Sequence, residues 1–144
     1  MSKKLVVEKS VKLNADLSNV WEALTNPEIT KKYFFNCEAI SDWKVGSPII
    51  FKMTSDGKEI VAVKGIVTAI EPERLLEYSC FTPEFENVPS KHTTVAYKLS
   101  SENDVTELSV TQGDFGDDEK AYNDTDAGWD NVLDGLKMIL ESQK

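Results

Sequence analysis

Few of the residue types that carry out chemistry occur in this chain of 144 residues. His92 is its only histidine, and histidine is the side chain that most often serves as a general acid or base. Because His92 follows Ser90 and Lys91 in a polar stretch that contains two prolines, we expect it in a solvent-exposed loop. The chain also lacks the GxSxG, Walker and GxGxxG motifs of common hydrolases, NTPases and dinucleotide-binding proteins. We therefore predict no catalytic residue.

The candidates for holding a metal ion or a cofactor are equally weak. The acidic run between residues 114 and 119 could suggest a divalent cation, but its spacing is not that of an EF-hand loop. Such a run is typical of a solvated loop that places negative charge at the N-terminus of a helix. Cys37 and Cys80 show no CxxC spacing, so we interpret them as reduced thiols that act as small hydrophobic side chains. We predict no metal ion and no cofactor.

The net charge of the chain limits its binding partners, and its apolar segments indicate its location. Twenty-five acidic and sixteen basic residues give a formal charge of −9, and such a surface repels nucleic acids and anionic lipid head groups. No window approaches the roughly 18 consecutive apolar residues that a membrane-spanning helix needs. The N-terminal sequence MSKKLVVEKS lacks the apolar region of a signal peptide. We expect a cytoplasmic protein with no nucleic-acid partner and no membrane span.

Helical periodicity is clearest near the C-terminus. Between Asp118 and Leu140, apolar residues recur at helical spacing from Trp129 onward, with aspartates and a lysine between them. This pattern predicts one long amphipathic helix. Near the N-terminus, Asn14 or Asp16 can cap a short helix that the pair Asn26-Pro27 ends. A second short helix is predicted over residues 28–34.

The remaining apolar segments read as strands because β-branched and aromatic residues alternate with polar ones. These segments are Lys4–Leu13, Ile49–Thr54, Ile60–Glu71, Leu75–Phe81, Thr93–Ser100 and Val105–Gln112. Asp56-Gly57 is a strong hairpin signal, since glycine accepts the positive φ of a tight turn. Strands followed by a terminal helix, without βαβ alternation, predict an α+β domain in which a helix covers an antiparallel sheet. We treat residues 1–144 as this single domain.

The order of these elements resembles the START-like helix-grip superfamily, also called SRPBCC, in which six to seven curved antiparallel strands wrap around a long C-terminal helix. The stretch VWEALTNPE at residues 20–28 is similar to the opening motif of the branch named after the activator of the heat-shock-protein-90 ATPase. Further similar motifs follow in the order of that branch: Tyr33-Phe34, where Trp-Phe is frequent; Gly65-Ile66-Val67 with Glu71-Pro72 and Leu76; and Gly128-Trp129 with Val132-Leu133 and Leu136-Lys137.

The resemblance implies a cavity between the sheet and the last helix, which relatives use to bind lipids or hydrophobic metabolites, to cyclise polyketides or to assist a chaperone. Two positions depart from the family pattern. Many members carry Trp where this chain has Cys80, and His where it has Gln112. A cavity lined in this way is expected to select a different ligand.

Strand alternation, read with the register of the family, turns one set of side chains toward the helix. With the aromatic cluster near residue 34 and the facing side of the helix, it defines the candidate ligand-binding residues: Tyr33, Phe34, Phe51, Met53, Tyr78, Cys80, Tyr97, Gln112, Trp129, Val132, Leu133 and Leu136. These residues either pack solid or leave a cavity. Tyr78, Tyr97 and Gln112 are the most informative, because an unpaired buried polar group costs roughly 1–3 kcal/mol.

Three functions fit these observations. The first is a carrier or sensor that binds a small hydrophobic molecule or lipid, with no defined catalysis. The second is a protein-interaction module that acts as a chaperone ATPase activator or stress-response cofactor. The third is a cyclase or aromatase-like enzyme, with Tyr78 or Tyr97 as the acid. A monomer or a weak homodimer is expected in each case.

Overall fold

The structure is a computed structural model and describes residues 5–88, 91–113, 115–116 and 118–142. Its elements, in chain order, are β1 (Val7–Leu13), α1 (Leu17–Thr25), α2 (Pro27–Tyr33), β2 (Glu38–Ser41), β3 (Pro48–Ser55), β4 (Lys58–Glu71), β5 (Leu75–Cys80), the 3-10 helix η1 (Pro83–Phe85), β6 (Thr93–Glu102), β7 (Val105–Gly113) and α3 (Glu119–Ser142). Among the described residues, no helix is long and apolar enough to cross a membrane.

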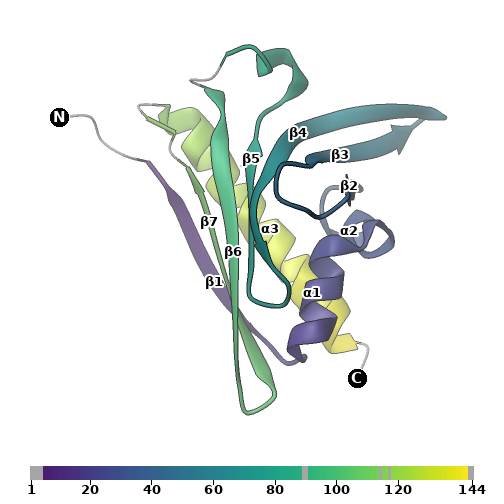
Figure 1. The fold of residues 1–144 in the computed structure, drawn as a ribbon, viewed down its shortest axis with the longest axis vertical. Coiled ribbons are helices and arrows are strands. Elements are labelled where there is room, and N and C mark those ends of the chain that lie inside the picture. Colours follow the sequence, from purple (N-terminus) through teal and green to yellow (C-terminus); the bar gives the residue numbers. More distant parts are fainter. Residues whose placement is uncertain (1–4, 89–90, 114, 117, 143–144) are drawn as a thin grey trace.

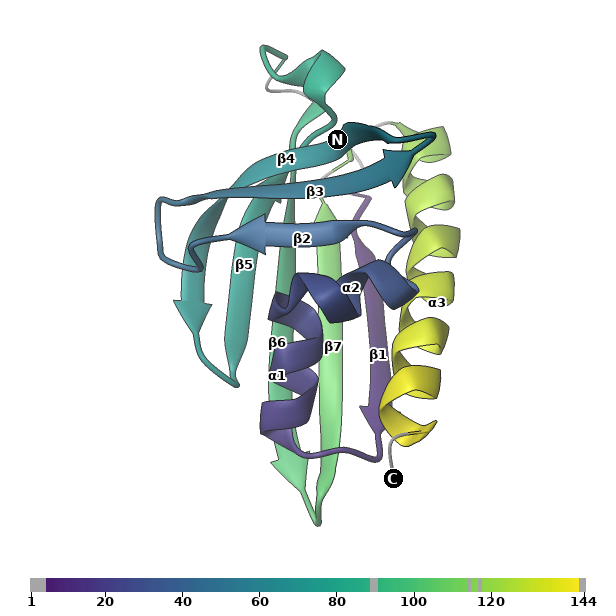
Figure 2. The same ribbon diagram turned by 90° about the vertical axis from the view of Figure 1, so that its right-hand side faces the viewer.

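One antiparallel sheet contains all seven strands, in the order β1-β7-β6-β5-β4-β3-β2. The sheet curves around α3, which runs along its concave face (Figure 1). In the view turned by 90°, α1 and α2 lie below the β2 end of the sheet and beside the C-terminal half of α3 (Figure 2). The α+β helix-grip fold predicted from the sequence is confirmed.

The longest strand, β4, carries the bend that makes the sheet curve. Its first part pairs with β3 and its last part with β5, and the register shifts in both pairings. Gly65 lies near the end of the first part, opposite Ile49, where a Cβ atom would be 1.7 Å from the carbonyl oxygen of Ser79. Only glycine allows this close approach of two backbones. Asp56 and Gly57 both have positive φ and form the predicted turn between β3 and β4.

Local sequence signals set the ends of the helices. The carboxylate of Asp16 caps α1 by accepting a hydrogen bond of 2.9 Å from the backbone N–H of Asn19. Asn26 ends α1 and caps α2, whose first residue is Pro27. The carboxylate of Asp118 accepts a bond of 3.1 Å from the N–H of Ala121 at the start of α3. These caps lie within two residues of the predicted helix boundaries.

Strand β2 was not predicted. Its four residues pair only with β3 and form the edge of the sheet beside α2. Such a short segment, with one alanine and one isoleucine, carries too little alternation to signal a strand. The first strand begins at Val7 rather than at Lys4, which lies outside the described residues. The other strand ends agree with the predicted ones to within two residues, and several coincide.

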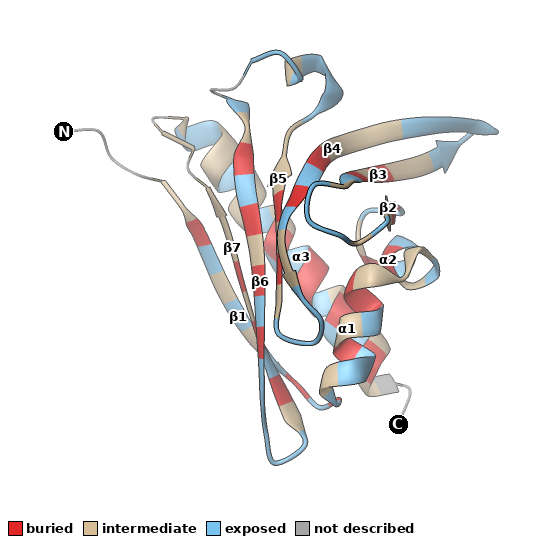
Figure 3. Cartoon of the chain, viewed as in Figure 1, coloured by how far each residue is buried: buried red, intermediate tan, exposed pale blue. Residues whose placement is uncertain are grey.

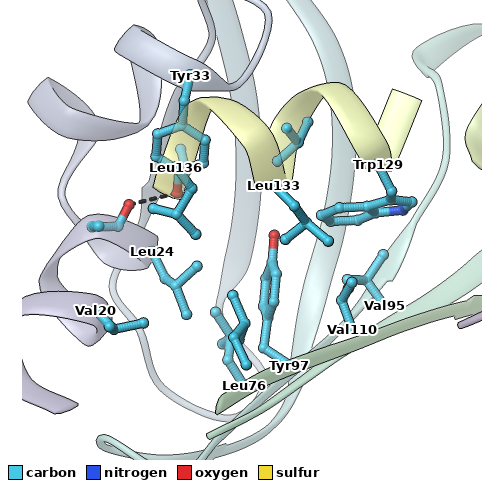
Figure 4. Packing of buried hydrophobic residues seen from close by; sticks show 14 of the residues in the cluster. Val20, Leu24, Tyr33, Leu76, Val95, Tyr97, Val110, Trp129, Leu133 and Leu136 are labelled. Carbon is cyan, nitrogen blue, oxygen red and sulfur yellow. Dashed lines mark hydrogen bonds between the residues drawn. The ribbon is translucent and has the colours of Figure 1, made fainter. Parts of the chain in front are cut away.

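Burial is concentrated where the C-terminal half of α3 faces α1 and the sheet. Figure 3 shows buried positions along these elements, whereas the outer end of the β3–β4 hairpin is exposed. Leu136 of α3 packs here with Leu24 of α1 and Leu76 of β5, all at most 5% exposed (Figure 4). We call this region the packed end of the space between sheet and helix.

Candidate functional site

A cavity of about 760 Å³ lies at the opposite end of this space, against the N-terminal half of α3. The sheet contributes residues from β3 to β7, and the connection from β5 through η1 to β6 contributes Thr82, Glu84, Phe85 and Lys91. Phe34 and Phe35 approach it from the end of α2. We call this region the open end. Its volume is within the range that small-molecule sites occupy, about 300–1,000 Å³.

Five aromatic rings form a closed circuit at the inner limit of this cavity, and we call them the aromatic floor: Phe34, Phe51, Tyr78, Tyr97 and Trp129. Successive ring centroids are 4.9, 5.7, 6.3, 5.7 and 5.8 Å apart around the circuit. These distances are those of stable aromatic pairs. Four of the five rings line the cavity; only Tyr97 does not. The floor therefore separates the cavity from the packed end.

A hydrogen-bonded network of polar side chains crosses the inner wall. The indole N–H of Trp129 donates to Gln112 Oε1 at 2.8 Å, and Gln112 Nε2 donates to Thr93 Oγ1 at 3.0 Å. The Thr93 hydroxyl in turn donates to the Cys80 carbonyl at 3.5 Å. Helix α3 is thus tied to three neighbouring strands through neutral groups. Each of these four residues lines the cavity.

The titratable groups of the inner wall are held in their neutral forms. Burial raises the pKa of the Cys80 thiol to about 11, against a smaller lowering effect of the hydrogen bond with Thr93. Burial also raises the pKa of Tyr78 well above its ordinary value, and the neighbouring Tyr97 adds to the shift. At neutral pH neither the thiol nor the phenol is ionised. Neither group is therefore an activated nucleophile or base.

Charged side chains lie at the rim and form pairs with one another. Lys91 Nζ is 3.3 Å from Asp118 Oδ2, which connects the approach to β6 with the start of α3. Lys120 Nζ is 2.8 Å from Asp124 Oδ2, one turn further along α3. Both hydrogen bonding from the Ala121 N–H and the pairing with Lys91 lower the pKa of Asp118. The rim is thus charged and the interior is neutral.

His92 lies in a loop, as predicted, but it is half-buried rather than solvent-exposed. Its ring stacks on that of Phe81, with centroids 4.2 Å apart and an interplanar angle of 15°. His92 Nε2 lies 2.9 Å from the carbonyl oxygen of Phe85. The polar neighbours in the sequence concealed this contact, because Phe81 reaches His92 only when β5 and β6 pair. The histidine fastens the β5–β6 connection and does not line the cavity.

The predicted site residues divide between the two ends. Those that line the cavity are Phe34, Phe51, Tyr78, Cys80, Gln112, Trp129 and Val132. Those that do not line it are Tyr33, Met53, Tyr97, Leu133 and Leu136. Tyr33 is buried and donates a hydrogen bond of 2.6 Å to the carbonyl of Ala23 (Figure 4). The Tyr97 ring stands beneath α3 beside Leu133, in the body of the core (Figure 4).

Several residues of the cavity wall escaped sequence reasoning. They are chiefly Val63, Phe81, Thr93, Phe115 and Gly128, besides the charged rim. Thr93 could have been identified, because it alternates with Val95 and Tyr97 on the same face of a predicted strand. Phe81 and Phe115 lie just beyond the paired ends of their strands, where alternation no longer reports orientation. Among the described residues, no cluster of acidic, histidine or cysteine side chains could hold a metal ion.

Comparison of the sequence with models of known protein families identifies the family of this chain. Residues 14–141 match the family model of the Activator of Hsp90 ATPase homolog 1-like proteins. The chain belongs to this family. The Activator of Hsp90 ATPase homolog 1-like assignment agrees with the branch that the sequence motifs resemble, and the match spans all three helices.

Solved structures share the fold of this Activator of Hsp90 ATPase homolog 1-like chain. The solution structure of ChR145 from Cytophaga hutchinsonii is 33% identical with a TM-score of 0.80, and the match covers 99% of this chain and 98% of that one. The Aha1 dimer from Colwellia psychrerythraea is 21% identical with a TM-score of 0.74, covering 94% and 96%. DynU16, encoded in the dynemicin biosynthetic locus, is 21% identical with a TM-score of 0.75, covering 99% and 49%. No curated protein matches the chain.

Proposed function

We propose that this protein is a carrier or sensor that binds a small hydrophobic molecule in the cavity at the open end. The observation that carries the proposal is a cavity of about 760 Å³ whose inner wall is aromatic and neutral. A folded chain ordinarily fills such a space with side chains, because unfilled apolar volume is destabilising. Apolar wall with a few fixed polar groups is the usual composition of a ligand site.

The state of the titratable groups favours binding over catalysis. An enzyme of the cyclase kind needs an acid or base whose pKa lies near the working pH. Cys80, Tyr78 and Tyr97 instead have pKa values raised by burial, so that they retain their protons. They can orient a ligand, but they do not gain reactivity from their surroundings.

The test is to fill the cavity from the helix side. Val132 lines the cavity, so the ring of Val132→Phe occupies the space in which a ligand would lie. The matched control is Met138→Phe on the same helix, at a side chain that is 72% exposed. Native mass spectrometry of protein from its own host, followed by a thermal-shift screen of lipids and aromatic metabolites, should detect a ligand in the wild type and the control only. An empty wild-type mass and no stabilisation by any compound would refute the proposal.

Protein interaction is the second candidate, because the family takes its name from an activator of a chaperone ATPase. Exposed apolar side chains that could meet a partner are Val45 before β3, and Ile60 and Ile66 on β4. If docking is the function, Ile60→Ser with Ile66→Ser abolishes stimulation of a purified chaperone ATPase, and Val132→Phe does not. If the protein is a carrier, Val132→Phe abolishes ligand binding, and Ile60→Ser with Ile66→Ser leaves ligand binding intact.

Location and assembly remain predictions that accompany this proposal. Both cysteines are free thiols, which fits the reducing cytoplasm inferred from the sequence. We infer a monomer or a weak homodimer, and sedimentation over a range of concentrations distinguishes the two.

A further inference from the structure

The polar network of the inner wall limits the chemistry of a ligand more closely than cavity size does. The inference that follows rests on the proposed function, since it concerns the ligand of the same cavity. Its starting point is the orientation of the Gln112 amide. An indole N–H can only donate a hydrogen bond, so the amide atom 2.8 Å from Trp129 Nε1 is the oxygen. The amino group of Gln112 therefore faces Thr93 and Cys80.

One of the two N–H groups of Gln112 has a weak acceptor. An amide NH₂ group carries two N–H bonds, and two acceptors lie near Nε2 among the described residues. Thr93 Oγ1 lies at 3.0 Å, whereas Cys80 Sγ lies at 3.9 Å. Sulfur is a weak acceptor, and this distance is long. A stronger acceptor placed in the cavity would improve the second bond.

Each acceptor of the same wall already receives one hydrogen bond. Gln112 Oε1 receives the indole N–H, and Thr93 Oγ1 receives the amide N–H. The Cys80 carbonyl receives the Thr93 hydroxyl. A ligand that presents a carbonyl or ether oxygen is thus better matched by the wall than a ligand that presents only donors.

Among the described residues that line the cavity, those of the inner wall carry no charge. The charged residues that line the cavity are Glu84, Lys91, Asp118, Lys120 and Asp124, all at the rim. Four of them pair with each other as Lys91 with Asp118 and Lys120 with Asp124. An ionised group buried without a partner costs several kcal/mol or more. The buried part of the ligand must be neutral.

We propose that the ligand is a flat, uncharged aromatic compound whose carbonyl oxygen accepts a hydrogen bond from Gln112 Nε2 at the inner wall. The aromatic floor supplies offset and edge-on surfaces for such a ring system. Cys80 lies beside the carbonyl position and stays protonated, so no charge opposes the contact.

The test is titration of the wild-type protein with naphthalene, 2-acetonaphthone and 2-naphthoate, followed by calorimetry. These probes share one ring system and differ only in the group presented to Gln112. The ketone is expected to bind about five- to tenfold tighter than naphthalene, which corresponds to one net hydrogen bond. The naphthoate, ionised at pH 8, is expected to bind weakest. This order of affinities is expected for the wild-type protein.

Substitution of Gln112 tests whether this residue causes the difference in affinity between the ketone and naphthalene. Gln112→Met keeps the length of the side chain and removes its donors, so the ketone and naphthalene should bind to this variant with equal affinity. Equal affinities of ketone and naphthalene in the wild type, or tightest binding of the naphthoate, would overturn this inference and leave the carrier function standing. If none of the three binds and the native mass is empty, both proposals fail together.

Discussion

The two ends of the space between the sheet and α3 are built from similar residues but differ in how they are filled. At the packed end, the side chains of Leu24, Leu76 and Leu136 are at most 4% exposed. At the open end, Phe34, Trp129 and Val132 are of comparable apolarity, yet they surround about 760 Å³ of space. Composition therefore does not distinguish a core from a ligand site in this fold.

The difference arises from what approaches α3 at each end. Helices α1 and α2 contact the C-terminal half of α3 and fill the space there. No corresponding helix covers the N-terminal half among the described residues, where the curved sheet and the β5–β6 connection form the walls. Four predictions follow from the contrast, and each compares matched changes at the two ends.

Loss of apolar contacts is expected to have the largest effect. Leu136→Ala removes a side chain that is 1% exposed, and deletions of this kind cost about 2–5 kcal/mol. A matched pair sharpens the comparison: Val20→Ala at the packed end should reduce the free energy of unfolding more than Val132→Ala, whose methyl groups face the cavity. Urea denaturation measures all three. Equal losses for the two valines would mean that the open end is filled.

The loss of stability at alkaline pH tests whether the Cys80 thiol is shielded from water as well as the side chains of the packed end are. The unfolded thiol loses its proton near its ordinary pKa of 9.0 and the folded thiol near 11. Since the unfolded state then releases its proton first, stability is retained below pH 9 and falls between pH 9 and 11. At about 1.36 kcal/mol per unit, the fall from this group is at most about 3 kcal/mol.

Cys80→Ala should remove this part of the pH dependence. The buried tyrosines at both ends should continue the fall at higher pH, because burial raises their pKa values too. Cys37→Ala is the control for the second thiol. Denaturation series from pH 8 to 12 provide the comparison, and a Cys80→Ala curve parallel to that of the wild type would show that water in the cavity solvates the thiolate.

Deleting one hydroxyl group at each end is expected to have an intermediate effect. Tyr33→Phe leaves the buried carbonyl of Ala23 without its donor, and an unsatisfied buried group costs roughly 1–3 kcal/mol. Thr93→Val removes the acceptor of Gln112, but that amide lines the cavity, where water can replace the bond. The second change should therefore cost less. Thermal unfolding of both variants decides the order, and a larger loss for Thr93→Val contradicts it.

Substitution of the two glycines of α3 by alanine is expected to give the smallest difference in stability between the two ends. An alanine inside a helix is favoured over glycine by about 1 kcal/mol when nothing obstructs the methyl group. At Gly128 the nearest atom to a Cβ would be Phe35 Cζ at 3.6 Å, an ordinary contact, but at Gly135 it would be Tyr33 Cβ at 3.1 Å. Gly128→Ala should thus stabilise the protein more than Gly135→Ala. The melting temperatures of the two variants test this, and the reverse order would show that the packed end relaxes easily.

The limits of sequence reasoning follow from the same contrast. Helical and strand periodicity correctly turned Phe51, Tyr78 and Leu136 toward the space between sheet and helix. It could not separate Leu136 from Val132, because both occupy the same face of α3 and only the presence of α1 and α2 distinguishes their surroundings. Gln112 was correctly placed on the inner face, but its partners Thr93 and Trp129 depend on contacts between three separate elements.

Local chemistry in the sequence determined the long amphipathic helix, the helix caps at Asp16 and Asn26, the turn at Asp56-Gly57 and the α+β fold class. These features depend on residues that are close together in the chain, so they can be predicted from the local sequence. The tertiary structure alone decided which inward residues became core and which became cavity wall. That outcome depends on whether facing elements approach closely enough for side chains to interlock, a property of distances between segments that no single segment contains.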